Sequence, residues 1–275
     1  MAHAGDGCRR ADFRADALEN RPMPPNESMP RRSLVVGLLL AQLFCVPAMA
    51  ETPVYDEKPV FVTGMRNPEL KSYRVMLAGL DAFAEHHGLA PTAPMLRFKL
   101  RPQAGGAVVD MDNLELTIAG DETAIDVPLA QDDSFVLPRN EAAAKDDADL
   151  VLNKNKGGYR WRPDIHSAVV PAGMRRLGDL RLECEVAVAI AKKEMGFWLR
   201  TTVATLLRTT DWCTNSMLAL STETNGSISA ATLVGGGGRR VALEVSDDGR
   251  SYVALIADNT YLDDALIEFR YVISE

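Results

Sequence analysis

Residues 180–190 read Leu-Arg-Leu-Glu-Cys-Glu-Val-Ala-Val-Ala-Ile, and they carry the clearest strand pattern in the chain. Apolar side chains stand at every second position, with Arg181, Glu183 and Glu185 between them. A period of two puts alternate side chains on opposite faces of a strand. The stretch therefore predicts a half-buried β-strand whose inner face includes Cys184.

The same period recurs on both sides of this stretch. In Met-Leu-Arg-Phe-Lys-Leu-Arg, residues 95–101, Leu96, Phe98 and Leu100 face one way and three basic residues face the other. Regular short strands separated by turn residues are typical of antiparallel sheets. The segments expected to be rich in strands are residues 95–190 and, as a β-meander, residues 228–273.

Two segments instead have helical spacing. Asn67-Pro68 offers an N-cap followed by proline at the first helical position, and Gly88 offers a C-cap, which predicts a helix near residues 68–87. A second helix is expected near residues 195–208, although the threonines in this segment keep a strand interpretation open. Together these elements predict an α+β fold: mainly antiparallel β, sandwich-like, with two packed helices.

Residues 29–50 have the form of a secretory signal peptide. Arg31 and Arg32 precede a short apolar run, residues 34–46, and Ala48-Met49-Ala50 is a cleavage pattern. The run is shorter than the ~20 residues of a membrane-spanning helix, so we expect no membrane span after signal cleavage.

The expected cleavage after Ala50 leaves a single exported domain, residues 51–275, in the periplasm or outside the cell. Residues 1–28 are poor in large apolar side chains and are interpreted as a non-native upstream extension of the gene product. An unusually long n-region of the signal peptide is the alternative.

The expected mature chain is acidic. The full sequence has a formal net charge of −8, and residues 51–275 hold 24 basic and 33 acidic residues, a charge of −9. Nucleic acids reward a basic surface, so this balance argues against a nucleic-acid partner. It argues equally against an anionic lipid surface.

Only Cys184 and Cys213 of the four cysteines fall in the expected mature chain. Two cysteines in an oxidising compartment most simply form one disulfide. A buried free thiol at Cys184 is the alternative.

The richest group of polar and aromatic residues is Tyr159-Arg160-Trp161-Arg162-Pro163-Asp164-Ile165-His166. It follows the expected hairpin tip at residues 153–158, and binding groups commonly lie on such loops. Trp161, Arg162, Asp164 and His166 are the candidate ligand-binding residues, suited to an anionic or sugar-like ligand. Alternatively, Trp161 fills the edge of the core and the charged side chains are merely solvated.

No pattern of catalytic or metal-binding residues emerges. The chain has no G-x-S-x-G motif, and no two histidines lie three or four residues apart, the spacing that helical zinc sites favour. Gly235–Gly238 precedes an expected strand rather than a helix, so a phosphate-binding loop is not expected there. We therefore expect no catalytic residue, no metal and no cofactor.

These observations favour a non-enzymatic binding protein whose partner is an unknown protein or small ligand of the cell envelope. Whether the protein is an enzyme stays uncertain, with the balance against it. One alternative is a hydrolase-like enzyme that uses Asp164 and His166 as an acid–base pair. The other is a structural envelope protein without a binding site.

Overall fold

The computed structural model describes residues 66–103, 110–207, 209–215 and 221–272. By their contacts, all of these residues belong to one unit, Tyr55–Glu275. The predicted upstream extension, the signal peptide and its cleavage site lie outside the described residues.

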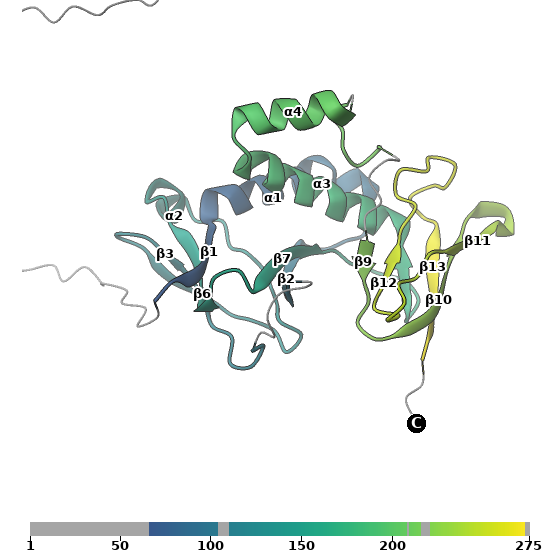
Figure 1. The fold of residues 1–275 in the computed structure, drawn as a ribbon, viewed down its shortest axis with the longest axis horizontal. Coiled ribbons are helices and arrows are strands. Elements are labelled where there is room, and N and C mark those ends of the chain that lie inside the picture. Colours follow the sequence, from purple (N-terminus) through teal and green to yellow (C-terminus); the bar gives the residue numbers. More distant parts are fainter. Residues whose placement is uncertain (1–65, 104–109, 208, 216–220, 273–275) are drawn as a thin grey trace, which may run out of the picture. The chain divides into compact units, whose positions relative to one another are not determined.

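The fold is α+β (Figure 1). Every strand pair in the described part is antiparallel. The first two sheets come from the N-terminal part of the chain, with strand orders β1-β6-β3-β4 and β5-β2-β7. Their strands are β1 (Pro68–Ser72), β2 (Arg97–Pro102), β3 (Leu116–Ala119), β4 (Ala124–Val127), β5 (Ser134–Phe135), β6 (Asp149–Asn155) and β7 (Tyr159–Asp164).

The other two sheets contain the C-terminal strands, with orders β11-β10-β13-β8 and β12-β9. In place of a simple meander over residues 228–273, β13 returns to pair with β10, and β12 pairs with β9. Arg181 secures the loop that permits this return, since it donates hydrogen bonds to three loop carbonyls and to Asp263. The strands are β8 (Met174–Arg176), β9 (Ser221–Glu223), β10 (Ile228–Val234), β11 (Arg240–Leu243), β12 (Ser251–Val253) and β13 (Leu266–Tyr271).

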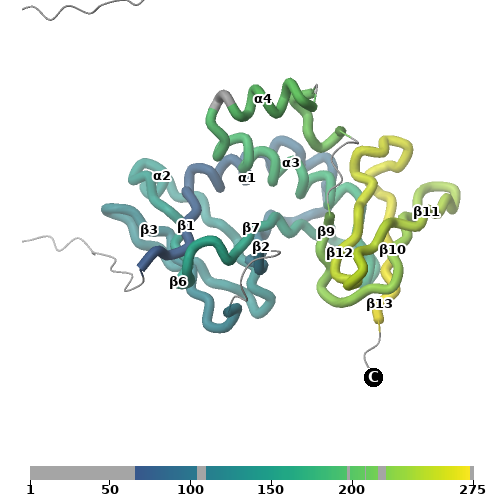
Figure 2. The backbone as a smooth tube through the Cα atoms, in the orientation of Figure 1, coloured from purple at the N-terminus to yellow at the C-terminus, as the bar shows by residue number. Residues whose placement is uncertain are grey.

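Four α-helices accompany these sheets in the described part (Figure 2). The predicted second helix is present as α4, and the helix predicted near residues 68–87 is shorter than expected. Residues 68–72 form β1 instead, because they pair with β6. The helices are α1 (Tyr73–Glu85), α2 (Glu141–Lys145), α3 (Leu177–Glu194) and α4 (Phe197–Leu207), with 3₁₀ turns η1 (His87–Leu89) and η2 (Gly236–Gly238).

The strand predicted over residues 180–190 is wrong, because this stretch lies within α3. Residues two apart on a helix point about 200° apart, whereas residues four apart lie on one face. Strict alternation therefore also fits a helix that is buried on two opposite sides. In α3, Leu182 and Val186 belong to one hydrophobic core, and Leu180 and Cys184 belong to another.

The first of these cores lies between α1, α3 and the N-terminal sheets. It contains Met76 of α1, Phe98 and Leu100 of β2, and Leu150 of β6, all fully buried. The second core lies between α3 and the C-terminal strands, with Leu233 and Ile267 at its centre. Because α3 contributes to both, its sequence shows no single apolar stripe.

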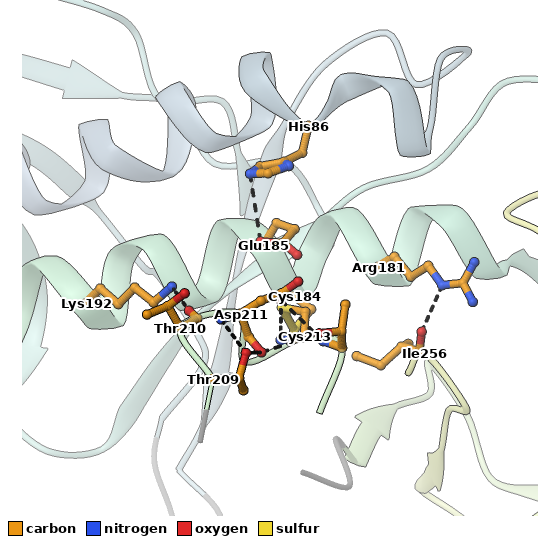
Figure 3. Close-up of a disulfide and its surroundings, with 11 residues drawn as sticks. His86, Arg181, Cys184, Glu185, Lys192, Thr209, Thr210, Asp211, Cys213 and Ile256 are labelled. Carbon is orange, nitrogen blue, oxygen red and sulfur yellow. Dashed lines mark hydrogen bonds and ion pairs between the residues drawn. A yellow bond between two sulfur atoms is a disulfide. The ribbon is translucent and has the colours of Figure 1, made fainter. Parts of the chain in front are cut away.

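Cys184 and Cys213 form the predicted disulfide, with their Cα atoms 5.9 Å apart (Figure 3). The bond attaches the segment that follows α4 to the middle of α3. Lys192 adds a hydrogen bond to the carbonyl of Thr210, at 2.7 Å. Closing a loop with a sequence separation of 29 residues contributes about 3–4 kcal/mol in the chain-entropy description.

Among the described residues, no helix combines the length and the apolar character needed to cross a membrane.

The close packing of α1 on α3 depends on Gly79. A Cβ atom at this position would lie 2.8 Å from Cδ1 of Ile190 and 3.2 Å from a methyl group of Val186. We expect Gly79→Val to lower the free energy of unfolding by roughly 1–3 kcal/mol, because overpacking forces the two helices apart. Urea unfolding measures the change.

Gly88→Ala is the matched control, since a Cβ atom there meets nothing within 4 Å. Equal urea midpoints for the two variants would contradict a tight helix crossing at Gly79.

Candidate functional site

The sheet β5-β2-β7 has one apolar face and one charged face. Phe98 and Leu100 of β2 and Tyr159 of β7 are buried in the first core. The alternate positions of the same strands face the other way and carry five basic residues. These are Arg97, Lys99 and Arg101 on β2, and Arg160 and Arg162 on β7.

The register of β2 and β7 brings like charges directly opposite each other. Lys99 pairs with Arg162, and Arg101 pairs with Arg160. Like charges at directly opposed positions of an antiparallel pair destabilise a sheet. The face therefore needs anions near it.

Two carboxylates contact four of these five basic residues and neutralise part of their charge. Asp132 accepts a hydrogen bond from Lys99 at 2.9 Å, and Glu223 of β9 contacts both Arg160 and Arg101. The hydrogen bond from the Ser134 hydroxyl, aided by Lys99, holds the pKa of Asp132 well below its usual range.

Arg162 differs from the other basic residues of this face. Within the described residues it forms no ion pair, and its one hydrogen bond is a long one, 3.5 Å, to the carbonyl oxygen of Ser221. A guanidinium group is always charged and offers a planar fork of donors to a carboxylate or phosphate. Among the described residues, Arg162 is thus the cation of this face that has no acidic partner.

A cleft of about 390 Å³ opens beside Arg162. Asp164 and His166 line it from the end of β7, Arg175 lines it from β8, and Tyr252 lines it from β12. The structure therefore brings together three of the four predicted ligand-binding residues: Arg162, Asp164 and His166.

Two carboxylates of α3 hold the chain where it leaves β7. Glu183 accepts a hydrogen bond from the backbone N–H of Ile165 at 2.8 Å. Asp179 accepts from both the backbone N–H and the hydroxyl of Ser167, at 2.9 and 2.6 Å. These bonds fix the backbone on both sides of His166, so the cleft rests on the helix that the strand prediction missed.

Asp164 and His166 form a direct pair, with Oδ1 and Nε2 3.0 Å apart. Burial pushes the pKa of Asp164 upward, but the hydrogen bond with His166 and the nearby positive charges outweigh it and leave that pKa below its usual value. The carboxylate orients the imidazole ring. Ser167 is engaged with Asp179, and in the described part of the chain no hydroxyl or thiol is hydrogen-bonded to His166.

Glu183 also binds Arg175, with Oε1 2.7 Å from Nη2. Burial alone would lower the pKa of Arg175, but the charge of Glu183 beside it raises that pKa above its ordinary value. The acidic groups that line the cleft, Asp164, Glu183 and Glu223, are therefore already paired with cations or backbone donors.

The structure separates Trp161 from the other candidates. Its ring packs edge-on against Phe135, with centroids 6.0 Å apart, on the core face of the sheet. Trp161 does not line the cleft but a second hollow of about 540 Å³ beside α3. This placement agrees with the alternative interpretation, in which Trp161 fills the edge of the core.

The adjacent histidines of the N-terminal part serve local contacts. His87 Nε2 lies 2.9 Å from the carbonyl oxygen of Ala93, and its ring packs on Phe83. His86 approaches Glu185 at 3.8 Å. Across the described ranges, no group of three or more His, Cys, Asp or Glu side chains is placed to hold a metal ion.

Sequence reasoning missed several residues of the cleft. The alternation of basic residues in 97–101 was visible, but the register that opposes them to Arg160 and Arg162 was not. Arg175 and Tyr252 carry no local signal, because only the folding of β8 and β12 against β7 brings them there.

Comparisons with protein-family models, curated proteins and solved structures found no match to this chain.

The lowered pKa of Asp164 predicts a pH-dependent contribution to stability. Since the unfolded value is about 3.9 and the folded value is lower, the contribution is complete above pH ~4 and is lost as the pH falls through the folded pKa. We expect Asp164→Asn to lose less stability than the unsubstituted protein between pH 6 and pH 3. Urea midpoints at the two pH values measure this.

Asp247→Asn, which removes an exposed carboxylate on another loop, corrects for the loss of one negative charge. If Asp164→Asn and the unsubstituted protein lose equal stability on acidification, Asp164 is not stabilised by His166.

Proposed function

We propose that the protein is an exported, non-enzymatic binding protein that captures an anionic ligand in the cleft at the end of β7. The observation that carries this proposal is the isolated charge of Arg162. It stands opposite Lys99 in the sheet register, borders the cleft and forms no ion pair within the described residues. A bound anion would relieve the repulsion that the register creates.

The charge of the whole chain supports a local site over a general attraction for anions. With a formal net charge of −8, the protein repels anions at long range. A ligand therefore needs directed donors, and the fork of Arg162 provides them. The partner is a small ligand or an acidic group of a protein in the cell envelope.

Inorganic phosphate and citrate are suitable first probes. We expect Arg162→Gln to weaken the binding of the tighter probe by roughly 10–100-fold, because hydrogen bonds to charged groups contribute about 1.5–3 kcal/mol. Titration calorimetry at constant ionic strength measures the affinities.

Arg270→Gln is the matched control, since Arg270 is an exposed arginine on β13 outside the cleft. The proposal is wrong if Arg162→Gln binds as tightly as Arg270→Gln, or if neither probe binds the unsubstituted protein more tightly than chloride.

A hydrolase is the second candidate, favoured by the hydrogen bond between Asp164 and His166 inside the same cleft. Such a pair can orient an imidazole as a general base for water. Turnover of 4-nitrophenyl phosphate that His166→Ala abolishes would select the hydrolase over the binding protein. Unaltered slow hydrolysis in His166→Ala would leave binding as the function of the cleft.

Export rests on two supports. The disulfide between Cys184 and Cys213 is compatible with an oxidising compartment, and residues 29–50 have the pattern of a signal peptide. We expect the protein exported from bacteria that express residues 1–275 to begin at Glu51, as read by N-terminal sequencing.

Leu39→Arg interrupts the apolar run and should block both export and cleavage. An exported chain that retains Met1, or one in which residues 34–46 remain uncleaved, contradicts the signal-peptide interpretation.

A further inference from the structure

The cleft is lined by a buried hydroxyl group that has no hydrogen-bond partner among the described residues. Tyr252 is 1% exposed, it lines the cleft, and its hydroxyl forms no hydrogen bond. An unsatisfied buried polar group costs about 1–3 kcal/mol, and such groups are few in native proteins. Because the hydroxyl of Tyr252 lies in a cleft, its position indicates that a bound molecule supplies the missing hydrogen bond.

A second unsatisfied donor lines the same cleft. Nε of Arg175 is buried and has no partner in the described part of the chain, although Nη2 of the same side chain binds Glu183 and the carbonyl oxygen of Ile165. An arginine nitrogen only donates hydrogen bonds. Burial raises the pKa of Tyr252 above its ordinary value, so its hydroxyl keeps its proton at neutral pH.

The acceptors of the cleft are already engaged. Asp164 is paired with His166, Glu183 with Arg175, and Glu223 with Arg160. Among the described residues, the groups left over are Nε of Arg175, the hydroxyl of Tyr252 and the guanidinium of Arg162, which makes one long hydrogen bond. A ligand that matches them must offer oxygen acceptors at more than one point.

An aromatic wall gives the cleft its apolar part. The rings of Tyr252 and Phe269 meet edge to face with centroids 5.0 Å apart, and Tyr271 continues the row at 6.1 Å from Phe269. All three line the cleft, and Tyr271 is 44% exposed. Aromatic side chains favour stacked or edge-on contact with another ring.

The size and charge of the cleft restrict the ligand further. A volume of about 390 Å³ falls in the range of sites for small organic molecules. Of the basic residues that line the cleft, Arg162 alone has no acidic partner among the described residues, and this matches one negative charge.

We infer that the ligand of this cleft is a small ring-bearing carboxylic acid. Its carboxylate binds Arg162, its ring lies against the wall of Tyr252, Phe269 and Tyr271, and a second oxygen accepts hydrogen bonds from Tyr252 and Arg175. This inference rests on the proposed function, because it names the ligand class of the same anion-binding cleft.

The test compares compounds that each remove one of these features. 4-Hydroxybenzoate and D-glucuronate represent the two sources of a ring with a carboxylate and a further oxygen, an aromatic acid and a sugar acid. Acetate lacks the ring, benzoate lacks the further oxygen, and glucose lacks the charge. Calorimetry should show 4-hydroxybenzoate or D-glucuronate binding at least about tenfold more tightly than acetate, and the tighter of the two identifies the source.

Tyr252→Phe isolates the contribution of the buried hydroxyl. The substitution should weaken the binding of whichever acid binds more tightly by about tenfold. It should also make 4-hydroxybenzoate bind no more tightly than benzoate. The fold should remain at least as stable, because the hydroxyl that is removed had no partner. Tyr261→Phe is the matched control: Tyr261 is also buried with an unpaired hydroxyl, but it does not line the cleft.

The outcomes separate this inference from the proposed function. If neither ring acid binds more tightly than acetate, or if Tyr252→Phe binds the tighter acid as well as Tyr261→Phe does, the ring-acid inference is wrong. The proposed function then still stands on the loss of phosphate or citrate binding in Arg162→Gln. If Tyr252→Phe fails to fold, the comparison with acetate on the unsubstituted protein decides alone.

Discussion

Helix α3 is buried on two opposite sides, and the other elements of the fold depend on this double burial. Leu182 and Val186 pack toward α1 and the N-terminal sheets, whereas Leu180 and Cys184 pack toward the C-terminal strands. The two sets of strands have separate cores, and α3 contributes side chains to both. The disulfide from Cys184 to Cys213 adds a covalent attachment to the same helix, so the segment after α4 is also fixed to it.

The candidate site follows from the same helix. Its N-terminal half supplies Asp179 and Glu183, whose carboxylates bind the backbone that follows β7 and thereby position His166 beside Asp164. The strand β7 brings Arg162 to the cleft in a register that opposes it to another cation. The register concentrates positive charge on this sheet face, and the nearby carboxylates neutralise only part of it.

The incorrect strand prediction for residues 180–190 has a definite physical cause. Alternation of apolar and polar residues distinguishes a strand from a helix only when one side of the element is buried. In α3 both sides are buried, so apolar residues two apart occupy opposite helix faces and imitate the pattern of a strand. Asp179 near the start of the helix and Lys192 and Lys193 near its end interact favourably with the helix dipole. This charge pattern indicates a helix, but it is a weaker signal than the alternation.

The sequence by itself determined the features that depend on residues close together in the chain, and the disulfide, for which only two cysteines were available. The alternation in β2 set which side chains face the core, the helical spacing located most of α1, and the count of two cysteines after residue 50 determined the disulfide pair. Only the tertiary structure decided the state of residues 180–190, the opposition of Lys99 to Arg162, and the presence of Tyr252 in the cleft. These features depend on contacts between residues far apart in the chain, and local periodicity carries no information about which strands become neighbours.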